Sequence, residues 1–80
     1  MEHMSNINVA IEVSRYAEEL NLKARLKAIG KTQVWLITEL RERGVNVGVS
    51  EMSYIINGNM TTPKARRVLE LSDEIIKRFD

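Results

Sequence analysis

The chain has few of the residue groupings that support catalysis or metal binding. It contains one histidine, His3, and no cysteine, so it offers neither a Cys/His cluster for zinc nor a disulfide. Its adjacent acid pairs, Glu18-Glu19 and Asp73-Glu74, would diverge rather than converge on a helix. No glycine-rich phosphate loop and no nucleophile–base pair can be placed. We therefore expect no enzymatic activity, no cofactor, no metal and no small-molecule ligand.

The charge distribution is more informative than the net charge. The net charge is only +1, but two stretches contain cations and no acidic residue. Such a distribution can create a positive face that attracts phosphate, although it also fits two ordinary solvated helix surfaces. The cations are Lys23, Arg25, Lys27 and Lys31 in the first stretch, and Lys64, Arg66 and Arg67 in the second.

Two short helical patterns lie between the basic stretches. The first begins after Thr32, whose hydroxyl can cap it, and ends before Gly44. The second begins after Gly48 or Ser50 and ends at Asn57-Gly58, and the spacing of its apolar residues favours Gly48. Two short helices joined in this way form the DNA-reading helix-turn-helix. The residues expected to face inward are Val34, Leu36, Ile37 and Leu40, then Met52, Ile55 and Ile56.

Helical patterns also flank this pair. Residues 6–29 form the first, capped by Asn6 or Asn8, with a break or bend expected near Asn21. The first half of this helical pattern is expected either to cover additional core or to form a dimer surface. The last helix begins at Thr62-Pro63, a capping hydroxyl followed by proline, and continues toward the C-terminus. The expected apolar stripes are Val9, Val13, Tyr16, Ala17 and Leu20, and Ala65, Val68, Leu69, Ser72, Ile75, Ile76 and Phe79.

These elements predict an all-α fold, a small bundle of four to five helices with a helix-turn-helix. Residues 6–80 form a single domain, and residues 1–5 are expected to be a disordered tail or a cloning remnant. An apolar fraction of 44% is typical of a globular chain. No apolar run approaches the roughly 20 residues that span a membrane, and no secretion signal precedes the domain. We therefore expect a cytoplasmic protein with no membrane partner.

The order of several short motifs resembles the lambda-repressor-like (xenobiotic-response-element) helix-turn-helix family. These motifs are Thr32-Gln33 followed by Leu36 and Leu40, then Ile55-Ile56-Asn57-Gly58 and the Thr-Pro helix start. The likeness covers about residues 22–79 and is closest to small regulators of phages and integrative mobile elements of Gram-positive bacteria. It implies a protein that binds double-stranded DNA and regulates transcription, for example as a repressor. The chain could also form a homodimer, since dimers that read paired half-sites are usual for this motif.

The resemblance also implies site residues, with the reading helix at about residues 49–57. Val49, Ser50 and Tyr54 fall where family members touch base edges, and Glu51 could accept a hydrogen bond from a cytosine amino group. The expected phosphate-binding residues are Lys31, Thr32, Gln33, Ser53, Asn57, Asn59, Lys64 and Arg67. Two positions depart from the family pattern. Gly48 replaces the usual polar cap, and Ile37 replaces a small alanine.

The reading helix is poor in strong base readers. It has no Arg, Asn or Gln before Asn57, so we expect modest specificity that depends on phosphate contacts and DNA shape. The alternative is a small helical protein–protein interaction module, such as an antirepressor or adaptor, that does not bind DNA.

Overall fold

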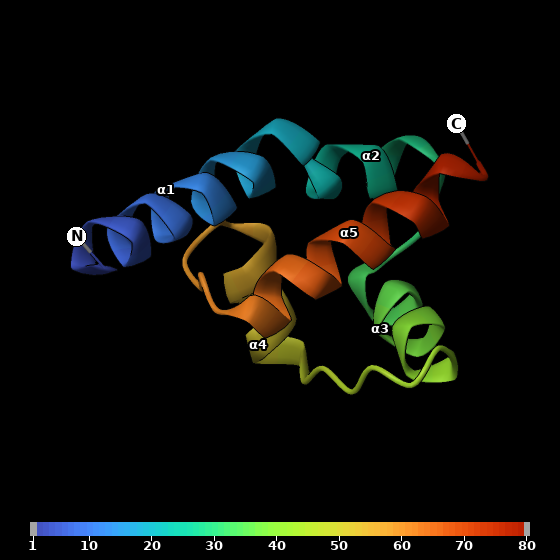
Figure 1. Ribbon diagram of the computed structural model, residues 1–80. Helices are drawn as coiled ribbons and strands as arrows, with labels where there is room; N and C mark the ends of the chain where they lie inside the picture. Colours follow the sequence, from blue (N-terminus) through green and yellow to red (C-terminus); the bar gives the residue numbers. More distant parts are fainter. Residues whose placement is uncertain (1, 80) are drawn as a thin grey trace.

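The all-α prediction is confirmed. The computed structural model describes the backbone of residues 2–79 and the side chains of residues 9–79, and no strand occurs in this part of the chain. Five helices follow one another over these residues, joined by short connections (Figure 1). They are α1 (Glu2–Leu20), α2 (Leu22–Ala28), α3 (Gln33–Glu42), α4 (Val49–Ile56) and α5 (Pro63–Lys77).

Helix α5 is the element around which the others pack. It contacts all four other helices, and Figure 1 shows it crossing the middle of the molecule beneath α1 and α2. Its start is the one predicted, because the Thr62 hydroxyl accepts a hydrogen bond from the Ala65 N–H at 3.1 Å and Pro63 occupies the first turn. The predicted stripe is buried except at its end, where Phe79 lies beyond the helix and is half exposed.

The predicted break between the first two helices is confirmed at Asn21. This residue has φ 48° and ψ 52°, the left-handed conformation that asparagine tolerates better than most residues. The start of α1 differs from the prediction, because the helix already includes residues 2–5 and does not begin at Asn6 or Asn8. Met1, the first residue of the expected tail, lies outside the described residues. Val9 was expected to face inward, but it is half exposed, and among the described side chains of this helix Val13 and Ala17 are the fully buried ones.

Helix α3 begins as predicted, but one of its apolar residues faces the opposite way. The Thr32 hydroxyl accepts a hydrogen bond from the Trp35 N–H at 3.1 Å, which caps the helix. Val34 was expected in the core, but its side chain is 62% exposed. It precedes Leu36 by two positions, which is about 200° around a helix, so burying Leu36 turns Val34 outward. Ile37, which the resemblance placed at a position where alanine is usual, is buried, so the larger side chain is accommodated in the core.

The connection between α3 and α4 is anchored to the core. Gly44 ends α3 in the left-handed region at φ 85°, and the buried side chain of Val47 holds the extended piece that follows. Gly48 is the residue before α4, as the apolar spacing favoured. Met52, Ile55 and Ile56 are buried, so α3 and α4 pack together through their inner faces.

The end of α4 is held against α1. Gly58 turns the chain at φ 78°, and a Cβ atom there would lie 3.1 Å from the Ser14 Oγ and 3.2 Å from the Ser14 carbonyl oxygen. Only glycine therefore lets α1 approach this turn so closely.

Among the residues described, no helix is both long enough and apolar enough to cross a membrane.

Candidate nucleic-acid interface

The outer side of α4 presents the predicted base-reading residues to solvent. Val49 is 65% exposed and Tyr54 is 54% exposed, and Ser50 between them is also exposed. This orientation follows from the inner side of the helix, whose apolar residues are buried against α3 and α5. Ser53, predicted to bind phosphate, is half-buried, whereas Asn57 at the end of the helix is exposed.

Glu51 and Lys64, predicted to contact a base and a phosphate, contact each other instead. The Lys64 Nζ lies 3.1 Å from one oxygen of the Glu51 carboxylate. The other oxygen accepts a hydrogen bond from the Gly48 N–H at 3.3 Å. The hydrogen bond from Lys64, followed by the one from Gly48, lowers the pKa of the Glu51 carboxyl below its ordinary value. These two partners fix the orientation of the carboxylate and use about half of its four acceptor sites.

The start of α3 lies among lysines from the preceding segment. A shallow hollow is lined by Gln33, the first residue of α3, together with Leu26 and three lysines. The free N–H groups at a helix start carry partial positive charge, and the lysines add to this field. We call these four polar residues the lysine face; they are Lys23, Lys27, Lys31 and Gln33.

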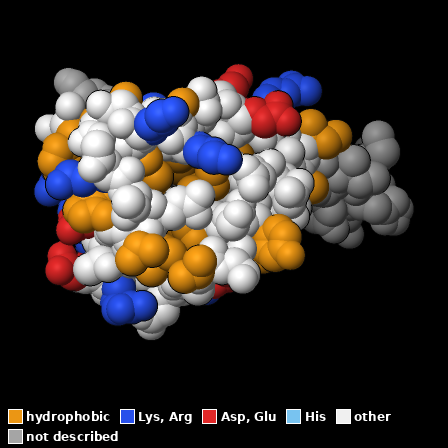
Figure 2. All heavy atoms as spheres, turned by 180° about the vertical axis from the view of Figure 1, so that it is seen from behind, with side chains coloured by type: hydrophobic (Ala, Val, Ile, Leu, Met, Phe, Trp, Pro, Cys, Tyr) orange, Lys and Arg blue, Asp and Glu red, His pale blue; other side chains and the backbone are white. Residues whose placement is uncertain are grey.

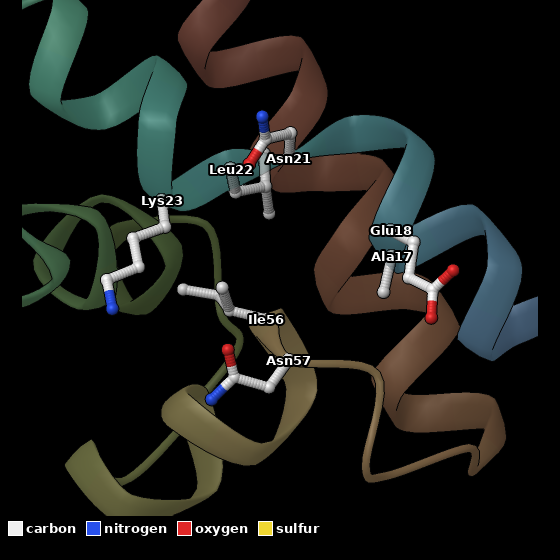
Figure 3. A pocket seen from close by; sticks show the side chains of 7 residues that line it. All are labelled: Ala17, Glu18, Asn21, Leu22, Lys23, Ile56 and Asn57. Atoms are coloured by element: carbon white, nitrogen blue, oxygen red, sulfur yellow. The ribbon is translucent and has the colours of Figure 1, made fainter.

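Lys23 connects the lysine face to the end of α4. It also lines a second hollow of about 280 Å³, between the α1–α2 junction and the last turn of α4. Figure 3 shows the side chains of Lys23 and Asn57 on the same side of this hollow, with Ile56 between them. Glu18 lies on the other side of the hollow in this view and would repel a phosphate placed there. Two donors 34 positions apart in the sequence are therefore available to one anionic group near Lys23.

The other cations of the two basic stretches have different roles. Arg25 forms an ion pair with Asp73 at 2.9 Å, which ties α2 to α5. Arg66 lies over the ring of Tyr16, 5.3 Å from its centroid, and also pairs with Glu70. These arginines hold the helices together, so the positive face is smaller than the sequence indicated.

Lys31 is held in place by two aromatic rings. Its Nζ lies 5.3 Å from the centroid of Trp35 and 5.6 Å from that of Phe79, and the two rings meet edge to face. Trp35 itself is partly buried and packs against the core. The contact also orders Lys31 beside Gln33.

The remaining predicted phosphate contacts are not gathered into this site. Ser53, Asn59 and Arg67 line neither hollow, and Thr32 uses its hydroxyl to cap α3. Lys23 and Lys27 were not predicted as individual site residues. The signal that could have found them was the first acid-free stretch, in which they stand four residues apart, on one side of a helix.

Figure 2 shows one face of the molecule. Apolar side chains cross its middle, Lys and Arg side chains lie above them and toward the margins, and the acidic side chains lie toward the edges. No group of acidic or histidine side chains that could hold a metal ion occurs in the described part of the chain.

Comparisons with known proteins identify no relative of this chain. A scan against protein-family models, a search of curated proteins and a search of solved structures find no match. The resemblance to the lambda-repressor-like family therefore rests on the motifs in the sequence.

Proposed function

We propose that this protein binds double-stranded DNA and acts as a transcriptional regulator of the phage or mobile-element type. In this proposal α3 and α4 act as a helix-turn-helix, and the outer side of α4 enters the major groove. The observation that carries the proposal is the position of the lysine face. It surrounds the start of α3, and Lys23 also lines the hollow at the last turn of α4, the helix that exposes Val49, Ser50 and Tyr54.

In this proposal different side chains bind the phosphates and the bases of the DNA. The lysines, Gln33 and Asn57 supply donors for phosphate oxygens, which set the position of the protein on the duplex. On α4, Val49 can pack against a thymine methyl group and Ser50 can hydrogen-bond several bases. None of these contacts is bidentate, so the proposal includes modest sequence specificity.

The experiment that tests the proposal is an NMR titration of the labelled protein with a generic DNA duplex, first at low salt and then at rising salt. We expect amide shifts at residues 23–27, 31–35 and 48–57 that disappear as salt is added. Amides at residues 9–12 of α1, which line neither hollow, serve as an internal control and should move least. A spectrum that does not change at low salt would refute DNA binding.

A protein–protein interaction module is the second candidate, and one observation favours it. Val34, Val49 and Tyr54 are all more than half exposed on the α3–α4 pair, and exposed apolar side chains are typical of protein contacts. The two candidates differ in salt dependence, because an apolar interface responds little to salt whereas phosphate contacts weaken steeply.

A further inference from the structure

We infer that the ion pair between Glu51 and Lys64 withholds Lys64 from DNA phosphates and so limits non-specific binding. This inference rests on the proposed function, since it concerns how strongly the same surface holds DNA. It reassigns two residues that the sequence placed in direct contact with DNA.

The pair joins the first turns of two helices. Glu51 lies in the first turn of α4 and Lys64 in the first turn of α5, 13 positions later. A lysine at the start of a helix is unfavourable, because the free N–H groups there already carry partial positive charge. The first turn of α5 contains no acidic residue of its own. The Glu51 carboxylate supplies the missing negative charge from outside the helix.

The same carboxylate also supports the start of α4. Gly48 has no side chain to cap the helix, and its own N–H donates to Glu51 at 3.3 Å. Glu51 is thus held by contacts on both sides, and a phosphate that approaches Lys64 must compete with it. Both side chains are still partly exposed, 48% for Lys64 and 30% for Glu51, so the ion pair weakens phosphate binding by Lys64 without abolishing it. Pairs of this kind change an equilibrium by up to about fivefold.

The test is a double-mutant cycle on DNA affinity, using Glu51→Gln and Lys64→Gln alone and together. Glutamine keeps an oxygen that can accept from the Gly48 N–H, so the start of α4 is retained. We expect Glu51→Gln to raise the affinity for a generic duplex by up to about fivefold and to steepen the salt dependence by about 0.9 in log–log slope. Lys64→Gln should change the affinity less than about twofold beside Glu51, and should reverse the gain in the Glu51→Gln background.

A matched control separates release of Lys64 from a change in net charge. Glu42→Gln removes one exposed acidic charge at the far end of α3, and we expect it to leave the slope unchanged. Equal effects of Lys64→Gln in both backgrounds would overturn the inference while leaving DNA binding intact. So would a loss of affinity in Glu51→Gln, which would make Glu51 a direct base contact. Absence of DNA binding by the unmodified protein would overturn the proposed function and this inference together.

Discussion

Replacing Lys23 and Lys27 by glutamine tests the lysine face directly. Both side chains are exposed and line the hollow beside Gln33, and no ion pair involves either of them within the described part of the chain. We therefore expect each to neutralise one phosphate when DNA binds. On duplex DNA each such contact contributes about 0.9 to the slope of log affinity against log salt. The double variant should thus have a slope about 1.8 shallower than that of the unmodified protein.

The size of the effect makes it easy to measure. When the salt concentration rises from about 50 to about 200 mM, the DNA affinity of the unmodified protein should fall roughly 12-fold further than that of the double variant. Fluorescence anisotropy of a labelled duplex, repeated at several salt concentrations, gives the slope. Trp35 is the only tryptophan and lies two residues from Gln33, so its emission offers an independent signal from the same site.

The control is Arg15→Gln with Arg41→Gln, which has the same net charge as the test variant. Arg15 lies on α1 and Arg41 near the end of α3; both are exposed, and neither lines the lysine face. We expect its slope to match that of the unmodified protein. Equal slopes for the unmodified protein and the lysine variant would refute the placement of the phosphate contacts. Equal losses in both double variants would show that only the total charge matters.

Three further predictions concern stability and can be checked by denaturant unfolding. Asp73→Asn should lower the free energy of unfolding by about 1–3 kcal/mol at neutral pH, because it removes the charge of a largely buried carboxylate that pairs with both Arg25 and Lys77. Burial favours a raised pKa for Asp73, but the hydrogen bonds from Arg25 and Lys77 together hold this pKa below the ordinary 3.8. The stability difference between the unmodified protein and Asp73→Asn should therefore be complete at neutral pH and shrink as the pH falls through 3.8 and below. A difference that stays constant with pH would contradict this. Ser72→Ala should raise the free energy of unfolding by about 1 kcal/mol, because the Ser72 hydroxyl is fully buried in the core and has no hydrogen-bond partner among the described residues. A loss of stability would show that the hydroxyl is satisfied. Thr62→Ala should lower it by about 1 kcal/mol through loss of the cap on α5, whereas Thr62→Ser should keep most of the stability.

The sequence by itself determined where the helices begin and end. The caps at Thr32 and Thr62, the glycine before α4 and the break at Asn21 all act over three or four residues, so the local sequence contains the whole interaction. The start of α1 was the exception. The local pattern placed a cap at Asn6 or Asn8, whereas the helix continues to Glu2.

Only the tertiary structure decided which side chains meet and which remain available. Helical spacing places a residue on a face, but the packing of α5 against the other four helices decides which faces are buried, and so Val34 points outward. The sequence grouped Arg25 with Lys23 as part of one basic stretch, yet packing pairs Arg25 with Asp73, 48 positions away, and leaves Lys23 beside Asn57. The physical reason is that an ion pair acts over a few ångströms in space, whatever the separation along the chain, so charge runs in a sequence show how much charge is present but not where it is used.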